Sequence, residues 1–164
     1  MNTSIYIGFS KPRGLKPVAE VIRLVEQTPF NHVYIRFQDP TTRLRMVLEA
    51  SHTTVHLEEC EAWRTRNEEV FEVRQDISAA QFEQVLSKGF IALQKPYSVL
   101  GLLGHLAMRV LRLPRNPYKD KGRSYICSEL VAHVLDIPNP EEQTPRTLFE
   151  HLQPTLPPDH DEVI

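Results

Sequence analysis

Cysteine is scarce in this sequence. Only two cysteines, Cys60 and Cys127, occur among its 164 residues. Two cysteines cannot form the disulfide framework of a small secreted domain, and neither has His or Cys neighbours at the spacing of a zinc finger. We therefore expect a reducing compartment, no metal site and no cofactor.

Long runs of basic residues are also absent. The chain has 19 Lys and Arg residues against 21 Asp and Glu, which gives a formal net charge of −2. Nucleic-acid binding normally depends on a strongly basic patch. The composition therefore argues against a nucleic-acid partner.

No hydrophobic run is long enough for a signal peptide or a membrane span. Residues 1–9 lack the basic start and the apolar run of a secretory signal, so we expect a cytoplasmic protein. The most apolar segment, residues 99–113, is too short to cross a bilayer and carries His105, Arg109 and Arg112. We interpret this segment as a buried helix.

The length of 164 residues is typical of one domain with a core of its own. We assign residues 1–152 to a single domain. Residues 153–164 are rich in proline and acidic residues, which predicts a mobile C-terminal tail.

Strand patterns gather in the first half of the chain and helix patterns in the second, which indicates an α+β fold. The β-rich runs predict a meandering antiparallel sheet of about five strands, packed against helices. These runs are residues 5–9, 32–37, 44–50, 53–57 and 70–73. The helical patterns cover residues 17–27, about 78–93, 97–113, 123–135 and 145–152. In the first helix, the stripe expected to be buried consists of Val18, Val21, Ile22 and Val25.

Cys127 stands at the head of a helical pattern whose apolar residues follow at +3, +4, +7 and +8. The cysteine should therefore face inward at the N-terminal end of the helix. There the helix dipole favours a thiolate, and a backbone amide can stabilise an oxyanion. A lone helical cysteine is also a common small core residue. Both interpretations stay open on this evidence.

A hairpin is predicted around the turn at residues 39–42 (DPTT). If Gln38 pairs with Arg43, His32 falls directly opposite Glu49, with β-carbons about 4.5–5.5 Å apart. A carboxylate at that distance can orient an imidazole and stabilise its protonated form. The alternative is an ordinary His–Glu pair on a solvated face, and a one-residue slip would separate the two side chains.

Cys127 as nucleophile, His32 as general base and acid, and Glu49 as the group that orients His32 together fulfil the roles of acyl transfer through a thioester. Cys60 lies among glutamates that disfavour its thiolate, so we exclude it as nucleophile. The other histidines lack comparable support and are expected to be structural or exposed; they are His52, His56, His105, His133 and His151.

Residues 125–131 (YICSELV) resemble the nucleophile motif of the NlpC-type papain-like cysteine hydrolases. The order His32, Glu49, Cys127 is similar to the circularly permuted branch of that superfamily, which includes the YiiX-like proteins and the lecithin retinol acyltransferases. Residues 31–35 (NHVYI) and 47–50 (VLEA) resemble its two strand motifs. The resemblance covers most of the chain and implies a permuted papain-like fold, in which the cysteine heads a helix packed against the sheet.

Residues 95–98 (KPYS) resemble the proline-tyrosine segment of this superfamily, where a tyrosine lines the active site. The resemblance implies that Tyr97 and Ser128 contact substrate, although an aromatic residue at a helix start also commonly fills the core. A glutamate at position 49 is closer to the YiiX-like pattern than to the acyltransferases. This favours a hydrolase.

The resemblance implies cleavage of an amide, ester or thioester. We expect a cysteine amidase or peptidase acting on peptidoglycan peptides or another amide, with delivery to a cell wall by a phage, a secretion system or lysis. One alternative is a lipid hydrolase or acyltransferase, in which residues 99–113 line an acyl pocket. Another is a non-catalytic binding protein that retains the fold. The oligomeric state stays open.

Overall fold

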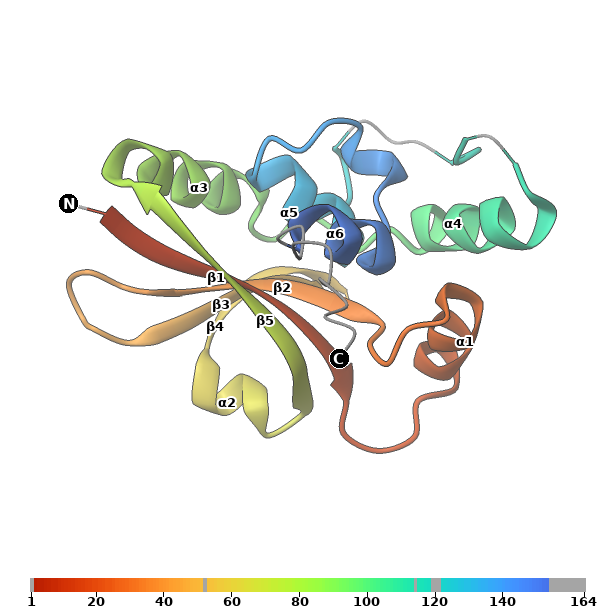
Figure 1. The fold of residues 1–164 in the computed structure, drawn as a ribbon, viewed down its shortest axis with the longest axis horizontal. Helices are drawn as coiled ribbons and strands as arrows, with labels where there is room; N and C mark the ends of the chain where they lie inside the picture. The colour runs from red at the N-terminus through yellow and green to blue at the C-terminus, as the bar shows by residue number, and fades with distance from the viewer. Residues whose placement is uncertain (1, 52, 114, 119–121, 154–164) are drawn as a thin grey trace, which may run out of the picture.

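A five-stranded antiparallel sheet with the strand order β4-β3-β2-β1-β5 forms the centre of the protein (Figure 1). The computed structural model describes residues 2–51, 53–113, 115–118 and 122–153, so the predicted tail lies outside the described residues except for Gln153. The predicted α+β class, with an antiparallel sheet and helices, is confirmed. The strands are β1 (Asn2–Pro12), β2 (His32–Gln38), β3 (Arg45–Ser51), β4 (Thr54–Glu59) and β5 (Asn67–Ser78).

The expected meander holds for β1 to β4 but not for β5, which pairs with β1 instead of β4. The chain reaches the far edge through α2 (Cys60–Arg64), a short helix that the sequence did not predict. This helix contacts β3, β4 and β5, so the sheet curves around it. A small buried cluster of Tyr34, Val47, Cys60 and Trp63 fills this side of the sheet.

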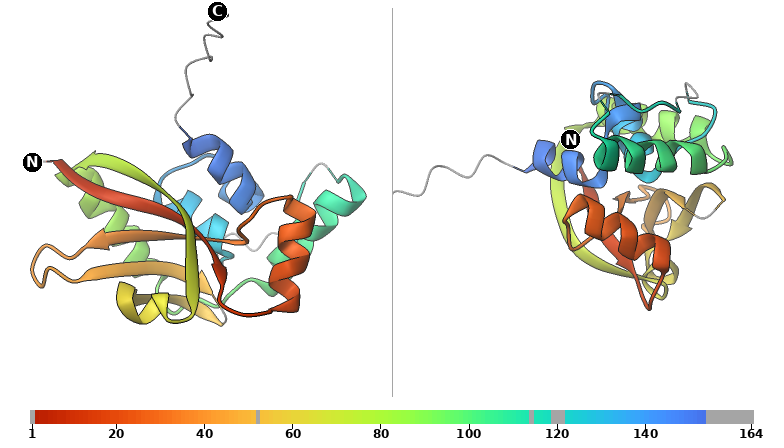
Figure 2. Two further views of the ribbon diagram at one scale, coloured as in Figure 1. Left: turned by 60° about the horizontal axis from the view of Figure 1, so that its bottom comes forward. Right: turned by 90° about the vertical axis from the view of Figure 1, so that its right-hand side faces the viewer.

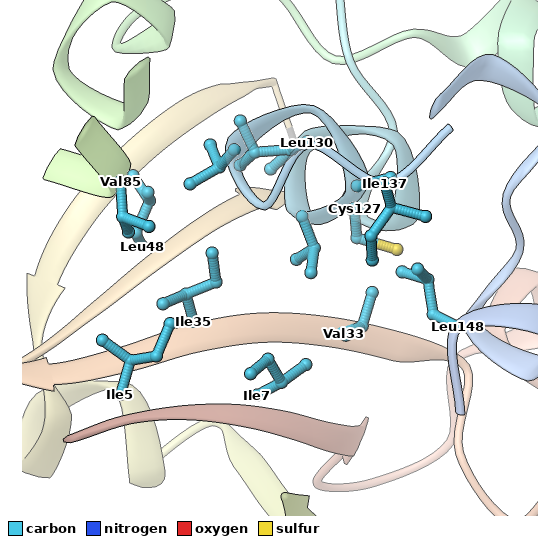
Figure 3. Close-up of a cluster of buried hydrophobic side chains, with 14 of the residues drawn as sticks. Ile5, Ile7, Val33, Ile35, Leu48, Val85, Cys127, Leu130, Ile137 and Leu148 are labelled. Atoms are coloured by element: carbon cyan, nitrogen blue, oxygen red, sulfur yellow. The ribbon is translucent and has the colours of Figure 1, made fainter. Parts of the chain in front are cut away.

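The main core lies between the other face of the sheet and three helices, α3 (Ala79–Ala92), α5 (Cys127–Val134) and α6 (Pro145–Leu152). Figure 3 shows side chains of β1, β2 and β3 meeting those of α3 and α5. Ser78 and Gln81 form a capping box at the start of α3, so the helix begins where the sequence predicted, near residue 78. Thr144 and Thr147 cap α6 in the same way.

The helix predicted from residue 123 begins four residues later, at Cys127. The preceding residues are extended because they pair with the segment before α4: Tyr125 N donates to Pro96 O at 3.0 Å, and Ser98 N donates to Tyr125 O at 2.9 Å. This pairing ends at Ile126, the N-cap residue of α5. It leaves Cys127 as the first residue of the helix.

Two helices, α1 (Pro17–Glu26) and α4 (Val99–Leu111), lie together at one end of the molecule (Figures 1 and 2). The prediction that α4 is buried is wrong, because at this end of the fold only Gly101, Gly104 and His105 of α4 are buried. None of the helices among the described residues is both long and apolar enough to cross a membrane.

The buried face of α1 also differs from the predicted stripe. The buried residues of α1 are Ala19, Ile22 and Glu26, whereas Val18 and Val21 are largely exposed. The helix can bury Glu26 because the hydroxyl of Thr144 donates to its carboxylate at 2.8 Å.

The predicted register of the β2–β3 hairpin is wrong by two residues, since Gln38 pairs with Arg45 and not with Arg43. The loop is longer because Asp39 Oδ1 accepts hydrogen bonds from Thr41 N and Thr42 N, and Arg43 adopts a left-handed conformation with φ 65°. Side chains alternate between the faces of a strand, so a shift by two residues leaves each side chain on its predicted face.

Candidate active site

Cys127 occupies the first turn of α5 and is 5% exposed. Its side chain belongs to the main core cluster and lies near Val33 and Leu148 at one side of it (Figure 3). The following apolar residues Leu130 and Val131 are fully buried, as the helical spacing predicted. The cysteine thus faces inward at a helix N-terminus, where unpaired amides and the helix dipole favour negative charge.

His32 and Glu49 are in direct contact, with 2.6 Å between His32 Nε2 and Glu49 Oε2. His32 is the first residue of β2, and Glu49 lies on the neighbouring strand β3. In the observed register the two are diagonal neighbours on one face of the sheet instead of direct partners. The structure therefore brings together the predicted pair by a different alignment of the strands.

The carboxylate of Glu49 is buried and accepts hydrogen bonds on both oxygens. Trp63 Nε1 donates to Oε2 at 2.8 Å, and Ser51 Oγ donates to Oε1 at 2.8 Å. His56 Nε2 lies 3.1 Å from Oε1. Burial on its own raises the pKa of Glu49, but the charge of His32 and these hydrogen bonds hold it far below the usual range. Glu49 is therefore ionised at neutral pH.

The surroundings of His32 favour its protonated form. Burial lowers its pKa, but the negative charges of Glu49 and Cys127 and hydrogen bonds to both side chains raise it to about 10. Because Nε2 contacts Glu49, the other ring nitrogen is the one available to Cys127. The arrangement thus joins a buried carboxylate to an imidazole that lies within electrostatic reach of the Cys127 side chain.

Tyr97 and Cys127 line the same cavity, together with Asn31. A neighbouring hollow is lined by His32 and Glu49 and shares Tyr97 and Asn31 with this cavity. Burial, followed by the charge of Cys127, raises the pKa of the Tyr97 hydroxyl far above its usual range. The hydroxyl therefore stays a hydrogen-bond donor.

Ser128 also lines the cavity, but its hydroxyl donates to the carbonyl of Gln143 at 2.6 Å. This bond connects α5 to the segment before α6. The side chain that was expected to contact substrate is thus already engaged within the protein.

Sequence reasoning missed Trp63 and undervalued His56, which contact Glu49. Trp63 gave no local signal because it reaches Glu49 from α2, across the curved sheet. His56 could have been found: a two-residue turn between β3 and β4 places it directly opposite Glu49.

The remaining candidates stay outside the site. Cys60 is buried in the small cluster, and burial is the main cause that raises its pKa; Glu61 adds to the shift, and nearby arginines oppose it. His105 is buried, which lowers its pKa to about 4, and His133 is partly buried on α5. His151 is exposed on α6. His52 lies outside the described residues.

The residues at the site do not fit a metal ion. In the part of the chain that the structure describes, no group of three or more His, Cys, Asp and Glu side chains is arranged to hold one. Glu49, the carboxylate closest to His32 and His56, already has both oxygens engaged by hydrogen-bond donors.

No protein-family model and no curated protein matches the chain. Among solved structures, the fold is similar to a crystal structure described as metalloprotein YiiX from Escherichia coli O157:H7, DUF1105. The TM-score is 0.57 at 17% sequence identity, and the match covers 82% of this chain and 63% of that chain. A YiiX-like fold is thereby confirmed. At this identity the likeness concerns the fold alone.

Proposed function

We propose that this protein is a cysteine hydrolase that cleaves an amide through a thioester acyl-enzyme. The observation that supports it most directly is the 2.6 Å contact between His32 Nε2 and Glu49 Oε2, beside a cysteine whose charge contributes to the raised pKa of His32. A thiolate at a helix N-terminus, an imidazolium beside it and a buried carboxylate behind the imidazole are the groups that acyl transfer requires.

In the proposed reaction the sulfur of Cys127 attacks the carbonyl carbon of the substrate. Backbone amides of the first turn of α5, and the Tyr97 hydroxyl, are available to stabilise the oxyanion. His32 then gives its proton to the departing amine as the C–N bond breaks, which leaves a thioester on Cys127. Neutral His32 next removes a proton from water, which attacks the thioester carbon; the C–S bond breaks, the acid leaves, and the Cys127 thiolate and protonated His32 are restored.

Glu49 acts on His32 and not on substrate. Its charge stabilises the imidazolium until the proton passes to the leaving group, and its contact with Nε2 fixes the ring and leaves the other nitrogen available to Cys127. Trp63 and Ser51 hold the carboxylate in turn. This support explains how the fold retains a buried charge.

The substrate class that we propose first is an amide, with peptidoglycan peptides as one example. A second candidate is a lipid ester or thioester, which a lipid hydrolase or acyltransferase would use. Its support is the lining of the cavity beside Cys127, where Leu102 and Leu106 of α4 and Ile22 of α1 supply apolar surface. Acyl chains bind to such surface.

Trapping of the acyl-enzyme tests the proposal. The purified protein is incubated with panels of peptide amides and of lipid esters or thioesters, and intact mass spectrometry measures the added acyl group. We expect an adduct on Cys127 that hydroxylamine removes, its loss in Cys127→Ala, and its retention in the control Cys60→Ala.

Adducts from lipid donors only would select the second candidate. A non-catalytic protein of the same fold would form no adduct with any donor, and hydrolysis that persists unchanged in Cys127→Ala would contradict both catalytic proposals.

A further inference from the structure

Helix α4 exposes an apolar stripe that the fold leaves uncovered. Leu100, Leu103, Val110 and Leu111 recur at helical spacing on one side of α4, and each is more than half exposed. The helix packs on the protein through Gly101, Gly104 and His105, which are its buried residues. The apolar stripe therefore faces away from the core.

The neighbouring helix extends this apolar surface. Leu15, just before α1, and Val18, Val21 and Leu24 are all about half exposed or more. Helices α1 and α4 lie side by side at one end of the molecule in every view (Figures 1 and 2). Exposed apolar side chains at this density mark an interaction surface.

The chain segment that contains α4 is mainly basic, although Arg109 of α4 lies 3.6 Å from the Glu26 carboxylate of α1. Residues 95–123 contain seven Lys or Arg residues and one Asp, in a chain whose net charge is −2. Arg112 and Arg115 are exposed at the C-terminal end of α4 and just after it. A helix with an apolar stripe and basic flanks is typical of helices that lie in the plane of an anionic membrane.

We propose that α4, with α1 beside it, is a docking site for the surface of a bilayer that contains anionic lipids. The apolar stripe would enter the boundary between headgroups and acyl chains, while the arginines contact lipid phosphates. The proposal concerns binding and does not depend on the chemistry of Cys127.

Charge favours this occupant over a second copy of the chain. A second copy of the chain would present the same mainly basic segment, residues 95–123, to this surface and would supply no complementary charge. An anionic membrane surface carries the complementary negative charge, and its hydrocarbon region can receive the leucine side chains. A nucleic acid has the complementary sign as well, but no apolar interior to receive them.

Sedimentation with vesicles tests the proposal on the full chain. We expect binding to phosphatidylcholine vesicles that contain about one-third phosphatidylglycerol, much weaker binding to phosphatidylcholine alone, and a decrease with added salt. The pair Arg112→Gln and Arg115→Gln should weaken the partition coefficient about 30-fold, because each basic residue near the surface contributes about fivefold. The pair Leu103→Gln and Leu111→Gln should weaken it about tenfold or more.

A matched control is available on α3. Phe90 and Ile91 are exposed to a similar extent at the other end of the helical layer, so the pair Phe90→Gln and Ile91→Gln should bind like the wild type. Cys127→Ser should also bind like the wild type, which separates this proposal from the proposed catalysis. Circular dichroism verifies the folding of each variant.

Three results would overturn the proposal. The first is that the wild type does not bind the anionic vesicles at low salt. The second is that the α4 variants bind as well as the α3 control. In the third case, sedimentation velocity shows a dimer that the Leu103 and Leu111 changes dissociate, which would make a second copy the occupant.

Discussion

At the scale of single residues, Glu49 is the centre of the site. Four side chains contact its two oxygens. They are His32 on β2, Ser51 on β3, His56 on β4 and Trp63 on α2. A buried carboxylate with this many donors stays ionised, and its geometry is fixed from several sides. The sequence predicted only the contact with His32. Side chains along a strand alternate with a period of two, and this alternation placed His32 and Glu49 on the same face of the sheet.

Trp63→Phe should leave the Glu49 carboxylate in the structure but hold its position less firmly. The change leaves an aromatic ring in the cluster but deletes the Nε1–H that donates to Glu49, so we expect the free energy of unfolding to fall by about 2 kcal/mol. The alkylation of Cys127 should also slow, because His32 loses part of its support. Circular dichroism in urea and the alkylation rate with iodoacetamide measure the two effects.

Tyr34→Phe is the matched control for Trp63→Phe. Tyr34 packs on Trp63 with ring centroids 4.3 Å apart, but its hydroxyl donates to Glu69 and Glu72 and not to Glu49. It should change stability while the alkylation of Cys127 stays as in the wild type. Equal slowing in both variants would show that Trp63 has only a packing role.

At the scale of elements, β1 and β2 shape the cluster that supports Glu49. Gly8 on β1 pairs with Tyr34 on β2, and a Cβ on Gly8 would lie 2.0 Å from Tyr34 Cζ. The glycine therefore leaves space for the Tyr34 ring, which packs on Trp63. The pairing of β1 with β2 therefore affects how Tyr34 packs on Trp63 of α2, and Trp63 in turn holds the Glu49 carboxylate.

Gly8→Ala should destabilise the fold by about 3 kcal/mol, because the added methyl group displaces an aromatic ring in a closed cluster. The same change in a Tyr34→Ala background should cost much less, since the ring is absent. Urea denaturation of the four proteins in this double-mutant cycle gives the coupling energy. Additive effects would contradict the packing described here.

Helices and strands with strong local sequence signals could be predicted, but their positions relative to one another could not. The capping boxes at Ser78 and Thr144 are visible in the sequence as helix starts. The loop of the β2–β3 hairpin depends on how Asp39 binds nearby amides, so its length was misjudged. The pairing of His32 with Glu49 still held, because an error of two residues preserves the face of a strand.

Burial at the periphery was the least predictable property. The apolar pattern of residues 99–113 indicates a buried helix only if other elements cover it, and α4 lies at the end of the molecule. The position of Trp63 depends on the curvature of the sheet around α2. Neither property is encoded within a short window of sequence.

At the scale of the whole molecule, the charged pair of His32 and Glu49 should couple stability to pH. The pKa of His32 is raised from 6.5 to about 10, so its stabilisation is complete below pH 6.5 and is lost as the pH rises towards 10. The pKa of Glu49 is lowered from 4.5, so its stabilisation is complete above that value and is lost in acid. The pair therefore contributes most at mildly acidic pH.

We expect the free energy of unfolding of the wild type to exceed that of His32→Gln by roughly 2–4 kcal/mol near pH 6 and by much less near pH 10. Urea denaturation across this range measures the difference. A difference that is independent of pH would mean that His32 is neutral in the folded protein.

The central claim is that His32 holds Cys127 as a reactive thiolate. The most direct measurement is the rate at which iodoacetamide alkylates Cys127 as a function of pH, in a Cys60→Ala background, with and without His32→Ala. We expect rapid alkylation of the parent near pH 6 and a decrease of about tenfold or more in His32→Ala, with the two rates converging in strong alkali. Superimposable pH profiles would contradict it.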